Sequence, residues 1–203
     1  MLIKKKLYAF LVMAVFMGST MANDIYIEQI GDTSTINITQ DGTGNTIGDS
    51  AIPAFIGGGS NTVAIDQVGI GNTLSLLVNG ASAATTVDTL GNNNTQSITC
   101  GSSASASCSG SVIKQLITGD DNTVTQNLGG GANHISEIAI VGDSNTVTHT
   151  STSSGASNVN IAVTGGTTAQ PNIISVNQSG STAQSVTVNS SGNGNNIAIV
   201  QSN

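Results

Sequence analysis

The sequence has very little positive charge. It holds four Lys and Arg residues against eleven Asp and Glu, and three of the four are the consecutive Lys4, Lys5 and Lys6. From Asn23 onward the only base is Lys114, so this part has a formal charge of 1 − 11 = −10. Nothing in it can neutralise a row of phosphates, which excludes nucleic acid as a partner. The same shortage argues against a β-helical enzyme such as a polysaccharide lyase, which needs basic residues or clustered carboxylates in a groove.

Aromatic and reactive side chains are also scarce. Trp is absent, and after residue 22 the only aromatic residues are Tyr26 and Phe55. The two His residues, His134 and His149, have no sequence neighbours that would complete a catalytic set, and we expect both on solvated turn faces. The sequence therefore predicts a protein that is not an enzyme, with no catalytic residue and with no cofactor or metal.

One short apolar run, residues 7–17, follows the basic cluster. Thr20, Met21 and Ala22 then supply small residues at a position where a signal peptidase cleaves. This order predicts a signal peptide over residues 1–22, with cleavage before Asn23. A membrane anchor is the alternative, but a span needs about 20 apolar residues, so no stable membrane insertion is expected. The chain is therefore expected to be secreted.

The sequence holds two cysteines, Cys100 and Cys108. Disulfides form and persist in secreted proteins. A close pair in an exported chain therefore predicts a disulfide that closes the 101–107 loop. Two free thiols are the alternative.

Gly, Ser, Thr and Asn are abundant, and Ile and Val interrupt them at regular positions. Residues 25–31 (IYIEQIG) return eleven positions later as 36–42 (INITQDG), and 40–47 (QDGTGNTI) returns as 67–74 (QVGIGNTL). The general unit, which we call an arm, reads Asn-x-[Ile/Val]-x-[Ile/Val]-x-Gln-x-Gly-x-x-Asn. A repeat of this kind decides the fold before any local pattern does.

An eleven-residue period fits either supercoiled helices or strands. Here the apolar residues recur at i and i+2 and are β-branched, and Gly and Asn interrupt every repeat, so each arm is a short strand and a turn. A turn that reverses the chain keeps the same side chains inward. We predict an all-β fold, a β-solenoid with two short strands per coil of about 22 residues. Residues 23–203 form one domain of about fourteen arms, hence about seven stacked coils.

Four stretches depart from the repeat: 48–60, 101–111, 152–158 and 165–171. The first contains Pro53 and the second is rich in Ser and Ala. We expect these insertions to loop out at turns without interrupting the stack.

The run Gln-x-Gly-x-Gly-Asn, at 40–45 and 67–72, resembles the repeat of curlins, the subunits of bacterial curli. The Ile-x-Ile-x-Gln before the first copy is similar as well, and the similarity extends loosely over most of the mature chain. It implies an extracellular functional amyloid, secreted unfolded through an outer-membrane pore, that polymerises into fibres for adhesion and biofilm matrix. The implied partners are further copies of the chain, a nucleating subunit and the outer-membrane secretion machinery.

The resemblance also implies a repeat ladder, in which side-chain amides of successive coils hydrogen-bond along the stack. Several arms depart from the curlin pattern, because Val78, Thr89, Cys100 and Ser190 stand where a Gln is expected. Carried over by position, the ladder residues are Gln29, Gln40, Gln67, Gln126, Gln178, Gln201, Asn45, Asn72, Asn122, Asn145 and Asn195.

A second function class arises from threonines that follow an Asn and should point outward. An outward Thr column would make a monomeric β-solenoid a surface-binding or ice-binding protein. Only Thr123 and Thr146 are followed by a second Thr two residues later, so this surface is incomplete and fibre formation is the preferred interpretation. The threonines of the column are Thr46, Thr62, Thr73, Thr95, Thr123 and Thr146.

Overall fold

The computed structural model describes residues 22–101, 108–129 and 131–203. These residues form eighteen β-strands and no helix, as the two-residue alternation predicts. The strands are β1 (Asp24–Ile25), β2 (Ile27–Ile30), β3 (Thr35–Thr43), β4 (Thr46–Ile47), β5 (Ala54–Gly57), β6 (Thr62–Ile70), β7 (Thr73–Ser75), β8 (Leu77–Asn79), β9 (Ala84–Leu90), β10 (Thr95–Ser97), β11 (Val112–Thr118), β12 (Thr123–Asn127), β13 (Ile135–Val141), β14 (Thr146–Ser151), β15 (Ser157–Thr164), β16 (Ile173–Ser179), β17 (Gln184–Ser191) and β18 (Asn196–Ser202).

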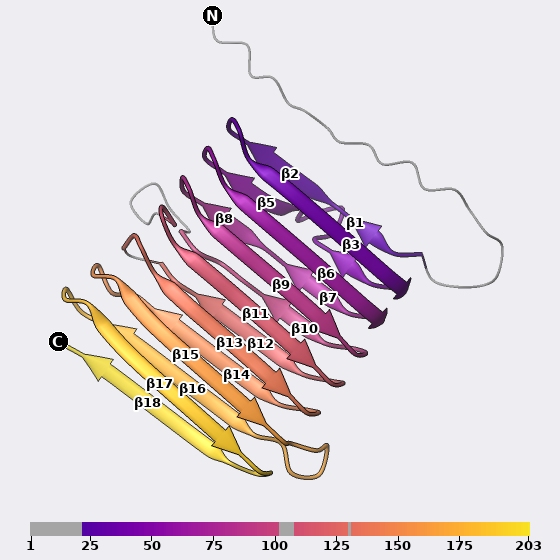
Figure 1. The fold of residues 1–203 in the computed structure, drawn as a ribbon, viewed down its shortest axis with the longest axis vertical. Helices are drawn as coiled ribbons and strands as arrows, with labels where there is room; N and C mark the ends of the chain where they lie inside the picture. The colour runs from indigo at the N-terminus through magenta and orange to yellow at the C-terminus, as the bar shows by residue number, and fades with distance from the viewer. Residues whose placement is uncertain (1–21, 102–107, 130) are drawn as a thin grey trace, which may run out of the picture.

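The strands lie in two layers, and the chain alternates between them so that its turns stack along one axis (Figure 1). The first layer is the eight-stranded sheet β1-β4-β7-β10-β12-β14-β16-β18, extended in its first three coils by the sheet β2-β5-β8. The second layer is the seven-stranded sheet β3-β6-β9-β11-β13-β15-β17. Apart from the strands at the end of each sheet, each strand pairs in parallel with its equivalents in the coils before and after it. The predicted β-solenoid, with two strands per coil, is confirmed.

The register gives the length of a coil. Asp24 pairs with Thr46, and Thr123 pairs with Thr146, so a coil has the predicted length of about 22 residues. In the first three coils the first-layer arm is interrupted, so that β1 and β2, β4 and β5, and β7 and β8 each make one arm. The described residues therefore hold eight first-layer and seven second-layer arms. This gives the predicted seven coils, and β18 adds a fifteenth arm to the fourteen expected.

Side chains alternate between core and solvent along each arm. In β6, Val63, Ile65 and Gln67 are buried, whereas Thr62 and Asp66 are exposed. The buried aliphatic residues form two clusters, one in the earlier coils and one in the later coils. At the boundary between the clusters the strands β10, β11 and β12 each bury a glutamine as well, namely Gln96, Gln115 and Gln126.

The glycine that ends each second-layer arm is required by the close stacking of the coils. Gly69 has a φ of 131°, which other residues rarely adopt. A Cβ on Gly69 would lie 1.9 Å from the carbonyl oxygen of Gly91 in the next coil. The glycine of the repeat is therefore fixed both by the backbone conformation and by the absence of space for a side chain.

Three of the four predicted insertions lengthen a coil. In a coil without an insertion, Ala84 in the second layer follows Thr73, the equivalent position in the first layer, by eleven residues. This is the period of the repeat, so no residue is added. The extra residues of the stretch predicted at 48–60 lie between β4 and β5, inside an arm rather than at a turn. Asp49 closes this loop, since its Oδ1 accepts the N–H groups of Ala51 and Ile52 at 2.7 and 2.6 Å. The insertions at 101–111 and 165–171 lie in turns, as expected.

The irregular stretch expected at 152–158 is not an insertion. The chain advances as far from Thr146 to Asn158 as it does in the preceding coil from Thr123 to Ile135. The stretch departs from the repeat in composition, because Ser residues replace the usual Gly and Asn. Ser151 and Ser157 hydrogen-bond through their hydroxyls at 2.7 Å, which keeps the turn in register.

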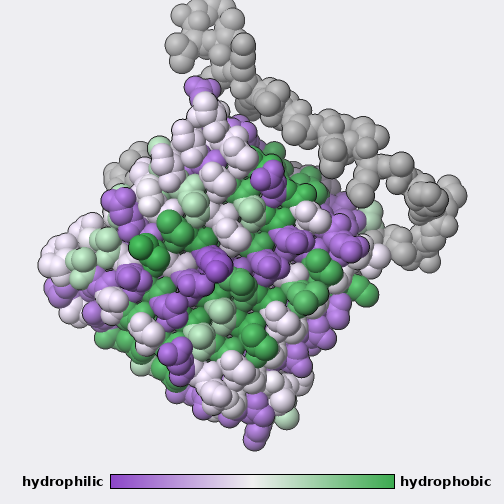
Figure 2. All heavy atoms as spheres, in the orientation of Figure 1, coloured by the Kyte–Doolittle hydropathy of each residue, from purple (hydrophilic) through white to green (hydrophobic). Residues whose placement is uncertain are grey.

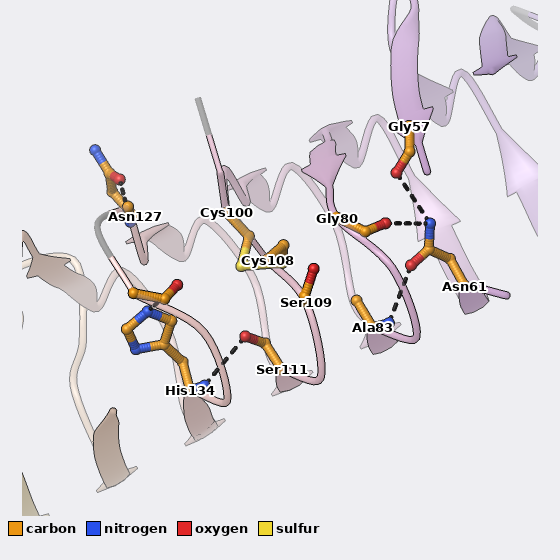
Figure 3. The surroundings of a disulfide bond; sticks show 12 residues. Gly57, Asn61, Gly80, Ala83, Cys100, Cys108, Ser109, Ser111, Asn127 and His134 are labelled. Carbon is orange, nitrogen blue, oxygen red and sulfur yellow. Dashed lines mark hydrogen bonds between the residues drawn. A yellow bond between two sulfur atoms is a disulfide. The ribbon is translucent and has the colours of Figure 1, made fainter. Parts of the chain in front are cut away.

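Cys100 and Cys108 are joined by a disulfide, with their Cα atoms 5.2 Å apart (Figure 3). Both are fully buried, and residues 102–107 between them lie outside the described residues. Cys108 rejoins the regular path of the turn, where its N–H donates to Asn79 of the preceding coil at 2.8 Å. The disulfide thus closes the base of the insertion and keeps β10 and β11 in register with their neighbours.

The outward residues form lines along the stack, because the coils pair in register. Figure 2 shows hydrophobic and hydrophilic residues in such lines on the face in view. On the second layer, Lys114 and Glu137 are register partners and form an ion pair of 3.1 Å. Both side chains are more than 40% exposed, so the pair adds little to stability.

Candidate functional site: amide ladders and open edges

Asparagines form a continuous ladder at the turns that lead from the second layer back to the first. The side-chain oxygen of each Asn accepts a hydrogen bond from the Asn one coil later, at 2.9–3.0 Å in every step. The ladder consists of Asn23, Asn45, Asn72, Asn94, Asn122, Asn145, Asn172 and Asn195.

Asn122 shows the geometry of one rung. Its Oδ1 accepts the backbone N–H of Asn145 at 2.9 Å and the Nδ2 of Asn145 at 3.0 Å. Its own Nδ2 donates to the Oδ1 of Asn94 at 3.1 Å and to the carbonyl of Gly142 at 2.8 Å. The side chain is fully buried. Each amide therefore ties three coils together and satisfies turn groups that no strand pairing reaches.

The five asparagines predicted from the sequence all lie in this ladder. Three further members, Asn23, Asn94 and Asn172, were not predicted. Each stands two residues before an inward-facing position, as in Asn172-x-Ile174 and Asn94-x-Gln96. The spacing between the asparagine and the inward-facing residue was therefore present in the sequence. In the arm of Asn94 it was harder to recognise, because Gln96 stands in place of an aliphatic residue.

The glutamines do not form one ladder. Gln40 donates to Gln67 at 2.8 Å in the second layer, and Gln178 donates to Gln201 at 3.1 Å in the first. These two pairs lie at opposite ends of the stack. In both pairs the Nε2 of the earlier coil donates to the Oε1 of the later one.

Gln29 and Gln126 were wrongly placed in that ladder. Gln29 pairs in register with Ile56, so no amide lies beside it in the next coil. Gln126 follows its turn asparagine by four residues, whereas the paired glutamines follow their turn residue, which is Ser34, Asn61, Asn172 or Asn195, by six. Gln126 therefore lies in register with His149. This difference of two residues, which is one inward-facing position along the arm, moves its side chain from the edge of the core to the middle.

Both histidines are buried, which corrects the expectation of solvated turns. His134 takes the position of the turn amide on the other side of the solenoid: its Nε2 donates to the Gly131 carbonyl at 2.9 Å, and its Nδ1 accepts the Ser157 N–H at 3.1 Å. His149 lies inward on β14, with its Nε2 3.2 Å from the Oε1 of Gln178. Burial lowers the pKa of His134, and it lowers the pKa of His149 to about 4.

Gln115 and Gln126 stand out among the buried amides, because neither their Oε1 nor their Nε2 atoms have a hydrogen-bond partner within the described residues. A buried polar group without a partner costs about 1–3 kcal/mol. Replacing both with Leu, which has a similar volume, is therefore expected to raise the free energy of unfolding by about 2 kcal/mol or more. Urea denaturation of the monomer measures this.

The matched control for that double replacement is Gln178→Leu, which removes an amide that has partners on both sides. This variant is expected to be less stable than the unmodified chain. A destabilised Gln115→Leu/Gln126→Leu variant would show that the two buried amides are satisfied in solution.

The threonine column is present on the first layer. Thr46, Thr73, Thr95, Thr123 and Thr146 pair in one register line. Two residues later a second line carries Ser75, Ser97, Thr125 and Thr148. Thr62, also predicted for this column, lies on the second layer instead, because its asparagine belongs to the opposite turn.

The two ends of the stack expose strand edges of complementary character. In the first layer the outward-facing residues donate their N–H groups to the next coil, as Tyr26 does to Ile47 and Gly48 to Leu74, both at 2.8 Å. Ala198 occupies the same register line in the last arm, so its N–H points to the open edge. Inward-facing residues direct their groups to the preceding coil, as Ile98 does to Ser75. In the first coil the backbone N–H and C=O groups of inward-facing residues have no preceding coil to pair with, so they face the open edge at that end of the stack.

No group of three or more His, Cys, Asp or Glu side chains that could hold a metal ion occurs within the described residues. Nor do residues 22–101, 108–129 and 131–203 contain a helix long and apolar enough to cross a membrane. Fold and ladders together define the chain as a parallel β-solenoid with a continuous asparagine ladder. Comparison with family models, with characterised proteins and with solved structures finds no match to this chain.

Proposed function

We propose that the chain is a secreted structural subunit that assembles end to end into extracellular amyloid-like fibres of the curli type, for adhesion and biofilm matrix. The observation that carries the proposal is the pair of complementary open edges. Within the described residues, β1, β2 and β3 at one end and β17 and β18 at the other each have a strand neighbour on one side only.

The ends also leave apolar residues incompletely covered. Ile27, Ile36 and Ile38 in the first coil, and Ile197 and Ile199 in the last arms, are partly exposed although they face the core. Natural solenoids that stay monomeric cover such ends with atypical polar or helical caps. Contact between unlike ends does not close on itself, so it produces a filament.

The proposed location outside the cell is based on the signal-peptide pattern of residues 1–22. Residues 1–21 lie outside the described part of the chain. The proposal also takes export through an outer-membrane pore and a nucleating subunit from the resemblance to curlins. The proposed role needs no enzyme activity, cofactor or metal.

Electron microscopy of the purified mature chain after incubation, together with binding of an amyloid dye, tests the proposal. Ala198→Pro removes an N–H that points to the open edge and leaves the pairing of β18 with β16 intact. We expect fibre elongation to slow by about tenfold or more, which corresponds to about 1.4 kcal/mol. The loss of one hydrogen bond together with a steric clash accounts for a change of this size.

Ala198→Val is the control, because it keeps the N–H and introduces a side chain that favours strands. Circular dichroism and thermal unfolding of both monomers check that the fold is unchanged. Unaltered elongation of the Ala198→Pro variant would show that this edge is not a growing end, and absence of fibres from the unmodified chain would refute the proposal.

The threonine lines on the first layer support a second candidate, a monomeric protein that binds an ordered surface such as ice. Five threonines in one register line with a second hydroxyl line beside them form a regular hydroxyl array, with strands about 4.8 Å apart. Thermal hysteresis measured on the monomer, beside the microscopy, distinguishes this function from fibre formation.

A further inference from the structure

The number of arms constrains how copies can stack. The described residues hold eight first-layer arms and seven second-layer arms. In a stack of copies in one orientation, β18 would pair with β1 and β2 of the next copy. The edge of β17 would then be separated from β3 of that copy by one vacant strand position, because the coil of β18 has no second-layer arm. Such a junction leaves the edges of β17 and β3 unpaired.

A half-turn about the fibre axis removes the gap. It places the first layer of the next copy in line with the second layer of the preceding copy along the fibre axis. The strands that then meet still run in the same direction, because the strands of the two layers run in opposite directions and the half-turn reverses both. The edge of β17 then pairs with β1 and β2 of the next copy, and β18 pairs with β3. The chain of arms continues through the junction without a vacancy.

The sequences of the four edge arms match in this arrangement. With Gln184 over Asn23, the inward residues Val186 and Val188 lie over Ile25 and Ile27 of the next copy, and Gly192 lies over Gly31. With Asn195 over Ser34, Ile197 and Ile199 lie over Ile36 and Ile38, and Gln201 lies over Gln40. Each apolar residue meets an apolar residue, and the turn glycine meets a glycine.

The glutamine pairs supply an independent reason for the rotation. Gln178 donates to Gln201 at one end of the stack, and Gln40 donates to Gln67 at the other. Rotation joins the two pairs into one four-residue ladder with the same donor direction throughout. The Oε1 of Gln40 is buried and has no hydrogen-bond partner within the described residues, and it is the acceptor that the Nε2 of Gln201 needs. Without rotation, Gln201 would meet Gln29, whose successor is Ile56.

We propose that the partner of each open end is a second copy of this chain rotated by about half a turn about the fibre axis, with β17 paired to β1 and β2 and β18 paired to β3. This inference rests on the proposed end-to-end assembly and adds the orientation of successive subunits. Fifteen arms make seven and a half coils, so each subunit advances the fibre by about 36 Å.

Two double-cysteine variants distinguish the orientations. In the rotated junction Val200 lies beside Thr39 of the next copy, and in the unrotated junction it lies beside Glu28. Adjacent strands are about 4.8 Å apart, within the Cα separation that a disulfide spans. The described residues contain no free cysteine, and the first and last coils of one chain are about 30 Å apart. Any new disulfide in Thr39→Cys/Val200→Cys or Glu28→Cys/Val200→Cys therefore joins two copies.

We expect fibres of Thr39→Cys/Val200→Cys, oxidised after assembly, to give a ladder of covalent multimers on a non-reducing gel, at least tenfold more than fibres of Glu28→Cys/Val200→Cys. The opposite preference, or fibres in which neither variant cross-links, overturns the half-turn while leaving end-to-end assembly standing. A chain that forms no fibres refutes the proposed function and this inference with it.

Cryo-electron microscopy of fibres of the unmodified chain provides a measurement that no substitution can disturb. The expected helical symmetry has a rise of about 36 Å per subunit and a rotation of half a turn in addition to the accumulated twist of the solenoid. A rotation equal to that twist alone would overturn the inference.

Discussion

Replacing Asn122 with Leu is expected to lower the free energy of unfolding by about 3–6 kcal/mol, although the two side chains have the same number of heavy atoms and the same branching. The substitution leaves the side-chain amide of Asn145, its backbone N–H and the Gly142 carbonyl without the partners they have at 2.8–3.0 Å. Each buried group left without a partner costs about 1–3 kcal/mol. Urea denaturation of the monomer measures the change.

Thr123→Ala is the matched control, because Thr123 is adjacent in the sequence but exposed on the outer face. We expect a change within about 0.5 kcal/mol for this surface position. Equal stability of the Asn122→Leu and Thr123→Ala variants would mean that the ladder contributes nothing to the monomer.

Acidification is expected to destabilise the monomer between pH 6.5 and about 4 through His149. Burial lowers the pKa of His149 from 6.5 to about 4, with the hydrogen bond to Gln178 opposing this and the charge of His134 adding to it. The unfolded chain therefore binds a proton in this range that the folded chain excludes. The stabilisation is fully present above pH 6.5 and is lost as the pH falls, by about 3 kcal/mol in all.

His149→Gln tests the assignment, because it replaces the titrating group with an amide of the kind that Gln126 already places in this register line. The slope of unfolding free energy against pH between 4 and 6.5 should fall, leaving the smaller contribution of His134, whose pKa burial also lowers. An unchanged slope would show that His149 is not the group responsible.

The fold could be predicted from the sequence because the repeat pattern indicates which residues face inward. Ile36 and Ile38, or Val63 and Ile65, alternate with polar residues in a way that only a strand accommodates. The asparagine ladder followed from the same spacing, since an Asn in each turn necessarily stacks on its equivalents when the coils pair in register. These features depend on local period alone and do not require knowledge of distant contacts.

The errors arose where position within the arm mattered more than residue type. Gln126 was assigned by identity, but its four-residue distance from Asn122 places it beside His149. The same count from Asn145 would have placed His149 in the core. The burial of His134 could not be predicted by counting from an asparagine, because His134 lies in the opposite turn. The equivalent positions of successive coils there hold Ser111, His134 and Ser157, which share no residue type.

The asparagine ladder has a direction, since every side-chain carbonyl in it accepts from the coil that follows. Hydrogen bonds in such a row polarise one another, so a rung with neighbours on both sides is stronger than a rung at an end. In the proposed half-turn junction Asn195 lies over Ser34 and Gln184 lies over Asn23, so the row of one copy is not continued by the next. Each copy therefore carries a self-contained row of eight asparagines, and the junctions between copies lack the reinforcement that the row gives to the coils within one copy.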